Sequence, residues 1–170
     1  MIALFERVEA EQGRLDILVN NAWAGAKHVM NPYFWNAPFW EQPIALLDDF
    51  YAVGLRSSYR CSQYAATIMA KQKNGLIVNI SLHAAKQYLV TPVHGIIKMA
   101  TDKMTSDTAH ELNQFNVKVF SLYPGSVATE GMQEIAKQDA SVKVEEMETP
   151  QFVGRCVAAL ALDDNSIHQS

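Results

Sequence analysis

The sequence has 170 residues, 49% of them hydrophobic and 19% charged, which suits one domain with a buried core and excludes a disordered chain. Its formal net charge of −4 excludes the basic surface of a nucleic-acid-binding protein, so no nucleic-acid partner is expected. Two cysteines are too few for a disulfide framework and favour an intracellular, cytoplasmic location, and no apolar run is long enough for a membrane span.

The N-terminal part of the chain predicts a helix, a strand and a long loop. Apolar residues recur at close to helical spacing over residues 1–12, and Gly13 ends this helix. Residues 16–20 contain the continuous apolar run Ile-Leu-Val, which predicts a short strand that is covered on both faces. Residues 22–44 are rich in Pro, Trp and Asn, and loops of this length are typical of functional segments.

Two long helices are expected in the middle of the chain. The first covers residues 43–73, begins with acidic residues, ends with basic ones, and is predicted to break near Gly54. The second covers residues 92–115, with Thr91 as its N-cap and Pro92 at its first position.

Two further apolar strands complete a repeating pattern of strand and helix. They are predicted over residues 76–80 and 117–122, and a last helix is expected to begin at Thr149-Pro150, before a turn over residues 163–166. This alternation is typical of a parallel α/β sheet. Three strands are few for such a sheet, so we expect a single domain over residues 1–170 that is incomplete at both ends.

Four segments carry a resemblance to a known family. They are Leu-Val-Asn-Asn-Ala-Trp-Ala-Gly at residues 18–25, Gly-Leu-Ile-Val-Asn-Ile-Ser at residues 75–81, His-Gly-Ile-Ile-Lys at residues 94–98, and Tyr-Pro-Gly-Ser-Val-Ala-Thr-Glu at residues 123–130. In this order and spacing they resemble the second half of the short-chain dehydrogenase/reductase family.

The resemblance implies a Rossmann-type, three-layer α/β/α parallel sheet, truncated at both ends, that binds NAD or NADP at the carboxyl ends of its strands. The implied activity is hydride transfer between the nicotinamide and a small-molecule carbonyl or alcohol. The residues that the resemblance assigns to cofactor binding are Asn20, Asn21 and Ala22 on the adenosine and ribose side, Pro124, Gly125, Val127 and Thr129 at the nicotinamide amide, and Lys98. For Asn20 and Asn21, a structural role at the strand end is an equal alternative.

The cofactor half departs from the family pattern. The glycine-rich turn of the family, Thr-Gly-x-x-x-Gly-x-Gly, does not occur in these 170 residues. That turn lets the backbone approach the pyrophosphate at a helix N-terminus. The acidic or basic residue with which the family selects NAD or NADP belongs to the same part of the family fold, which has no counterpart in this sequence.

The catalytic centre of the family pairs a tyrosine with a lysine four residues later, so that both lie on one helix face. Here Lys98 stands in the lysine position and His94 stands in place of the tyrosine. A nearby ammonium disfavours the charged imidazolium, which leaves a neutral base where carbonyl reduction needs a proton donor. The alternative for His94 and Lys98 is a solvated helix face.

Two other catalytic positions are altered. Ser81 stands where the family serine binds the substrate oxygen when counted back from His94, whereas the strand-end count gives Leu82. Tyr51 stands where the family has a helix asparagine.

Two functions therefore stay open. One is an NAD(P)-dependent oxidoreductase with Ser81, His94 and Lys98 as catalytic residues. The other is an inactive relative that acts as an interaction subunit, because the family often pairs its two long helices, here residues 43–73 and 92–115, across a homodimer. The side chains that either line a substrate pocket or pack elsewhere are Trp23, Trp35, Phe39, Trp40 and Tyr88.

Overall fold

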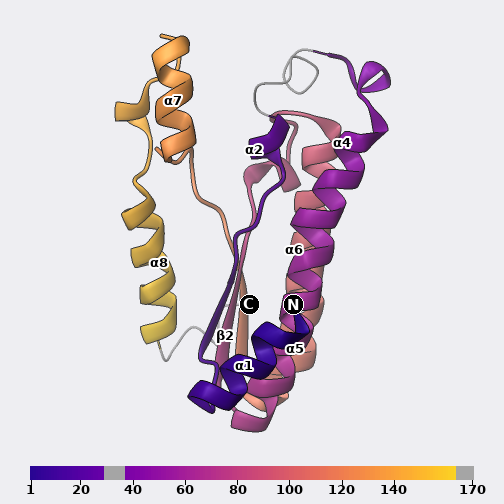
Figure 1. Cartoon of the computed structure of the whole chain (residues 1–170), viewed down its shortest axis with the longest axis vertical. Coiled ribbons are helices and arrows are strands. Elements are labelled where there is room, and N and C mark those ends of the chain that lie inside the picture. Colours follow the sequence, from indigo (N-terminus) through magenta and orange to yellow (C-terminus); the bar gives the residue numbers. More distant parts are fainter. Residues whose placement is uncertain (29–36, 164–170) are drawn as a thin grey trace. The chain divides into compact units, whose positions relative to one another are not determined.

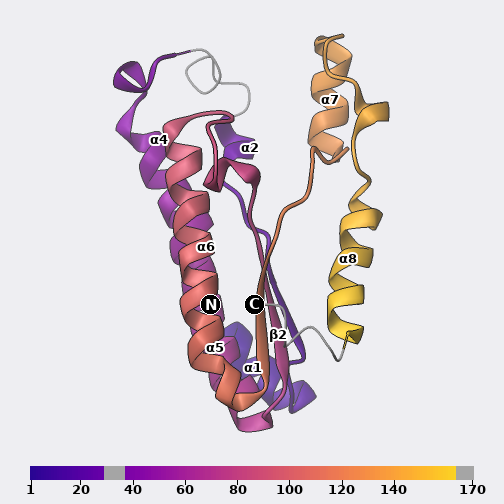
Figure 2. The same ribbon diagram turned by 180° about the vertical axis from the view of Figure 1, so that it is seen from behind.

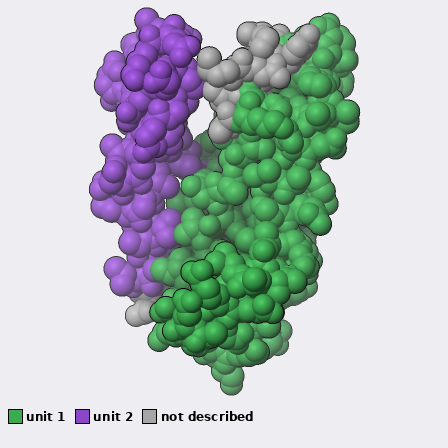
Figure 3. Space-filling view, in the orientation of Figure 1, with its two compact units in different colours: residues 1–122 green, residues 123–170 purple. Residues whose placement is uncertain are grey.

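A computed structural model describes residues 1–28 and 37–163 of the chain. The chain divides into two compact units, Met1–Leu122 and Tyr123–Ser170, and each is described by itself (Figure 3). Trp35 and most of the turn expected at residues 163–166 lie outside the described residues.

The first unit is built on a three-stranded parallel sheet. Its strands are β1 (Ile17–Asn20), β2 (Gly75–Ile80) and β3 (Val117–Leu122), and their order in the sheet follows the chain (Figure 1). Asn20 pairs with Asn79, and Ile80 pairs with Leu122. All three strands therefore end at the same edge of the sheet, and the predicted parallel α/β fold is confirmed.

Two long helices cover one face of this sheet, α5 (Ser57–Gln72) and α6 (Pro92–Leu112), and they run alongside the strands (Figure 2). Helix α1 (Ile2–Gln12) packs on α5, where the rings of Phe5 and Tyr64 are 5.3 Å apart. The buried core between helices and sheet includes Ala65, Ile68, Met69, Ile77, Leu112, Val117 and Val119.

Strand β1 differs from the expectation that both of its faces are covered. Ile17 and Val19 are each 40% exposed, whereas Leu76 and Val78 on β2 are buried. The reason is position, because β1 lies at the edge of the sheet and has a neighbouring strand on one side only. The prediction is correct for β2 and wrong for β1.

The first long helix is continuous rather than broken. Helix α4 (Ile44–Asp49) leads into a π-helix, η2 (Phe50–Arg56), and then directly into α5. The wider π turn absorbs the irregularity that the sequence suggested at Gly54. A Cβ at Gly54 would lie 3.3 Å from Ile97 Cγ2, so glycine at this position lets η2 approach α6 closely.

The predicted helix ends are confirmed. Gly13 closes α1 with a φ of 68°, a left-handed conformation that favours glycine. The Thr91 Oγ1 accepts a hydrogen bond from the His94 backbone N–H at 3.2 Å, and Pro92 begins α6. Helix α6 ends at Leu112, and a 3-10 turn, η4 (Asn113–Phe115), fills the rest of the predicted range.

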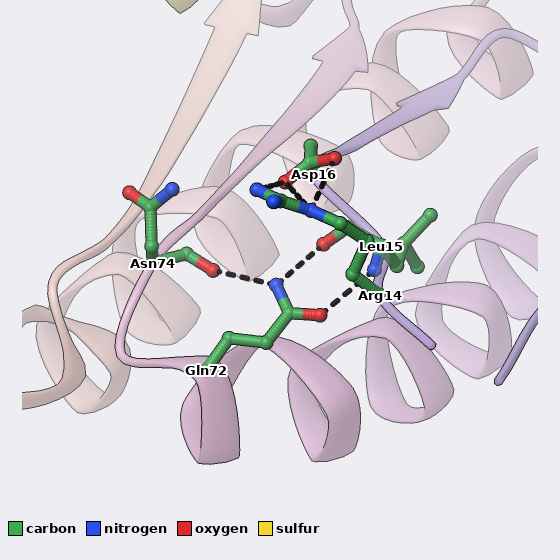
Figure 4. Close-up of polar contacts among 5 residues, drawn as sticks. All are labelled: Arg14, Leu15, Asp16, Gln72 and Asn74. Atoms are coloured by element: carbon green, nitrogen blue, oxygen red, sulfur yellow. Dashed lines mark hydrogen bonds and ion pairs between the residues drawn. The ribbon is translucent and has the colours of Figure 1, made fainter. Parts of the chain in front are cut away.

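The entry into β1 is joined to the end of α5 by one side chain (Figure 4). The Gln72 Oε1 accepts a hydrogen bond from the Leu15 N–H at 2.8 Å, and its Nε2 donates to the Leu15 carbonyl at 2.9 Å. The same Nε2 donates to the Asn74 carbonyl at 3.2 Å, at the turn into β2. Gln72 thereby satisfies three backbone groups of the two segments that lead into β1 and β2.

The second unit contains helices α7 (Glu130–Gln138) and α8 (Pro150–Leu162) with a short 3-10 turn, η5 (Val144–Glu146), between them. A parallel bridge joins Val127 to Glu148. The predicted start of α8 is confirmed, because Thr149 Oγ1 accepts a hydrogen bond from Phe152 N–H at 3.1 Å.

Candidate functional site

The two adjacent asparagines at the carboxyl edge of the sheet have different surroundings. Asn20 is buried, and its Nδ2 donates to Asn79 Oδ1 at 2.7 Å and to Ser62 Oγ at 3.0 Å. Asn21 and Ala22 follow at the end of β1 and are exposed. Asn20 therefore has a structural bonding role in this fold, whereas Asn21 and Ala22 are accessible to a ligand.

Lys98 lies on α6 next to the end of β2. Its Nζ donates a hydrogen bond to the Ile80 carbonyl at 2.8 Å. Burial lowers the pKa of Lys98 to about 8, against the opposing effect of the Asp102 carboxylate. An ammonium has three donors, so two remain for a ligand at this edge.

His94 lies one helical turn before Lys98 and is buried, with 6% of its surface exposed. Burial, and then the Lys98 charge, lower the pKa of His94 to about 4, so the imidazole is neutral at neutral pH. Among residues 1–28 and 37–163, the buried Nδ1 has no hydrogen-bond partner. The alternative of a solvated helix face is therefore wrong for His94. Burial is the larger cause of its lowered pKa, and the Lys98 charge lowers that pKa further, in the predicted direction.

Aromatic rings surround His94. Its ring centroid lies 5.9 Å from that of Trp23 and 5.7 Å from that of Phe50. Phe50 also lies 6.3 Å from His28, whose Nε2 is 2.8 Å from Asp49 Oδ2. The sequence interpretation missed the Phe50 contact, because only the packing of η2 against α6 brings that ring to the N-terminal end of α6.

Ser81 is buried, with 2% of its surface exposed, and its Oγ lies 3.5 Å from the Lys98 carbonyl oxygen. The next residue, Leu82, precedes a 3-10 turn, η3 (His83–Ala85). Tyr51 lies on η2 and is half exposed, and it lines a groove between η2, α5 and α6. The structure thus brings Ser81, His94 and Lys98 to one edge of the sheet.

The residues predicted to hold the nicotinamide amide belong to the second unit. They are Pro124, Gly125, Val127 and Thr129. Within that unit, Ala128 N–H donates to the Glu148 carbonyl at 2.8 Å, and Thr129 Oγ1 caps α7 by accepting from Met132 N–H at 3.4 Å.

The aromatic side chains noted in the loops have different surroundings. Trp23, 37% exposed, packs in the His94 cluster, whereas Phe39, Trp40 and Tyr88 are 63%, 73% and 76% exposed. The rings of Phe39 and Trp40 contact each other edge to face at 5.5 Å, in the short turn η1 (Phe39–Glu41).

Residues 1–28 and 37–163 lack two features that other functions would require. Within these ranges no three His, Cys, Asp or Glu side chains gather closely enough to hold a metal ion. None of the helices found there has both the length and the apolar character that a membrane crossing requires.

Comparison with known proteins gives relatives along nearly the whole chain. Human dehydrogenase/reductase SDR family member 1 is 44% identical over 179 aligned residues, which cover 99% of this chain and 56% of that protein. The mouse protein of the same name is 41% identical with the same coverage. D-xylose 1-dehydrogenase of Caulobacter vibrioides is 28% identical over 169 residues, or 94% of this chain and 64% of that enzyme.

Solved structures support the fold. ElxO with NADP bound has a TM-score of 0.83 at 24% identity, covering 96% of this chain and 66% of its own. NAD⁺-bound xylitol dehydrogenase has a TM-score of 0.80 at 20% identity, covering 97% of this chain and 69% of its own.

The length and the family follow from these matches. The chain spans little more than half the length of the human and mouse relatives. The family model described as short chain dehydrogenase matches residues 1–140, which is most of the chain. This chain is therefore a member of the short-chain dehydrogenase family.

Proposed function

We propose that this chain binds the nicotinamide end of NAD(H) or NADP(H) at the carboxyl edge of its sheet and transfers hydride between that cofactor and a small carbonyl or alcohol. The main support is Lys98, whose ammonium lies at the end of β2, hydrogen-bonded to the Ile80 carbonyl at 2.8 Å. Its remaining donors suit the hydroxyl groups of a ribose. Asn21 and Ala22, exposed at the end of β1, would contact the same cofactor.

The residues present fit only part of that cofactor. The Lys98 ammonium and the exposed end of β1 suit the ribose, whereas the chain contains no glycine-rich turn for the pyrophosphate. The bound cofactor would accept or donate the hydride. The assignment of the nicotinamide amide to Pro124, Gly125, Val127 and Thr129 stays a prediction from the family resemblance.

Proton transfer is assigned to His94. At neutral pH its imidazole is uncharged, so a bare ring nitrogen accepts the proton of an alcohol hydroxyl as the hydride leaves carbon. A histidine with a pKa of about 4 is a weak base. Its contribution to the rate therefore lies at the low end of the enhancement of about 10²–10⁴-fold that general acid–base catalysis gives. Ser81 is assigned the substrate oxygen. Contact of a substrate with Ser81 or with His94 requires the surrounding segments to open, because both side chains are buried.

Cofactor binding is tested by titrating the full chain with NADH and with NADPH and following nicotinamide fluorescence. Wild type is expected to change the fluorescence saturably, and Lys98→Met is expected to weaken binding at least tenfold, or about 1.4 kcal/mol, by removing a charge-assisted hydrogen bond. Lys103→Met is the matched control, because Lys103 lies on the same helix but is exposed and paired with Asp107. No fluorescence change at millimolar cofactor, or equal binding by both variants, would contradict the proposal.

A second candidate function is an interaction subunit that pairs with its own copy. A groove of about 620 Å³ lies between η2, α5 and α6. Tyr51 and Tyr59 in it are about half exposed, and the charged lining includes Arg60 from α5 and Glu111 from α6. In a two-fold interface the same patch meets itself, which allows the arginine of one copy to pair with the glutamate of the other.

This homodimer is tested by light scattering after gel filtration. Wild type is expected to be a dimer at micromolar concentration, and Arg60→Glu is expected to shift it to monomer by placing like charges together. Adding Glu111→Arg to the same chain should restore the dimer. A wild type that is monomeric, or a dimer that ignores both substitutions, would exclude this interface.

A further inference from the structure

A chain of polar side chains crosses the sheet beneath α5 and α6. Asn20 Nδ2 donates to Asn79 Oδ1 at 2.7 Å, and Asn79 Nδ2 donates to Thr105 Oγ1 at 2.8 Å. Ser121 Oγ lies 2.9 Å from Thr105 Oγ1 and donates to Asp102 Oδ1 at 2.8 Å. This buried polar chain of side chains thus joins all three strands and ends on a carboxylate.

The position of this carboxylate relative to Lys98 is informative. Asp102 follows Lys98 by four residues on α6, and residues with this spacing are neighbours on one helix face. The Asp102 side chain is only 15% exposed, so water screens its charge weakly. Burial of such a charge is unfavourable unless it has partners, and Ser121 supplies one.

Other titratable groups near this pair include Lys86 and His94. Lys86 Nζ, after η3, lies 4.0 Å from Asp102 Oδ2, but its side chain is 69% exposed, so this contact is weak. His94 faces Lys98 from the same helix and is neutral at neutral pH. β3 contributes the uncharged Ser121 hydroxyl. Asp102 is therefore the main anionic group acting on Lys98.

We propose that Asp102 is a positioning residue, whose carboxylate, oriented by Ser121 at the end of the buried polar chain, keeps Lys98 charged and directed to the Ile80 carbonyl. Without it, burial acts on Lys98 without an opposing carboxylate, which shifts the ionisation equilibrium towards the neutral amine. The consequence for ribose binding rests on the proposed function, but the effect on Lys98 does not.

The test measures ionisation of Lys98 in the full chain. Trace acetylation with acetic anhydride, followed by mass spectrometry of the peptide that contains Lys98, gives the reactivity of its amine as a function of pH. In Asp102→Asn the midpoint is expected to fall by about one pH unit, so that the amine reacts up to tenfold faster below the midpoint. Ser121→Ala is expected to lower it less, because the carboxylate stays and loses its orientation.

Asp107→Asn is the matched control, since Asp107 is on the same helix, exposed and paired with Lys103, and the Lys98 midpoint should not move. An unchanged midpoint in Asp102→Asn would overturn the proposal, and so would a rise towards 10.5, which indicates an exposed lysine. If Asp102→Asn does not fold, Ser121→Ala is the deciding variant. A lowered Lys98 midpoint in it supports the proposal, and an unchanged one overturns it. A lowered midpoint in a chain that binds no NADH would refute the proposed function and support the role of Asp102.

Discussion

Asn79→Leu is expected to lower the free energy of unfolding by about 2–4 kcal/mol, although leucine has the same branching and number of side-chain heavy atoms as asparagine. Asn79 is 1% exposed, donates to Thr105 and accepts from Asn20. Leucine removes both bonds and leaves buried polar atoms on its neighbours with fewer partners, at about 1–3 kcal/mol for each group left unpaired. Urea unfolding followed by circular dichroism measures the loss.

A double-mutant cycle separates this explanation from simple overpacking. Replacing Asn20 and Asn79 together with leucine removes both partners of their shared bond, so the double variant is expected to lose less than the sum of the single losses. Losses that add within about 0.5 kcal/mol, or an Asn79→Leu loss below that size, would show that the polar chain does not stabilise the sheet.

The second large effect is a dependence of stability on pH that comes from His94. Its pKa falls from 6.5 to about 4 on folding, so the folded state favours the neutral ring. The stabilisation is fully present above pH 6.5 and is lost as the pH falls towards 4, because protonation then favours the unfolded chain. A displacement of this size corresponds to about 3 kcal/mol.

His94→Phe isolates this contribution. Phenylalanine keeps an aromatic ring between Trp23 and Phe50 and cannot titrate, so the variant should lose about 3 kcal/mol less than wild type between pH 6.5 and 4. Subtracting the two curves removes the acid titration of the carboxylates, which both proteins share. His110→Phe, at an exposed position of the same helix, serves as the control and should follow wild type. Parallel curves for wild type and His94→Phe would contradict the burial of a neutral His94.

Signals that depend on neighbours in the chain predicted the elements well. The Thr91 cap, Pro92 and the left-handed Gly13 mark helix ends through hydrogen bonds or dihedral preferences within a few residues. The three strands were found because each is a short apolar run between turn signals. The family motifs predict Ser81, His94 and Lys98 at one edge of the sheet, since parallel strands end together.

Features that depend on distant residues were not predictable in this way. Exposure of Ile17 and Val19 follows from the position of β1 at the sheet edge, which its own residues do not show. The Lys98 effect on His94 was predictable from a spacing of four, whereas burial of the ring needs Trp23 and Phe50.

The buried polar chain was also missed. Asn79 and Asn20 are 59 residues apart in sequence, and only strand pairing brings them together. The one local signal was a pair of threonines at positions 101 and 105 of α6, four apart and therefore on one helix face.

The central claim, that the cofactor binds at the carboxyl edge of the sheet, is tested most directly by a ¹H–¹⁵N correlation titration of the labelled chain with NADH. The amides of Asn21, Ser81 and Lys98 should shift together and saturate with one dissociation constant. Shifts confined to the groove around Tyr51 and Tyr59, or no shift at millimolar NADH, would contradict it.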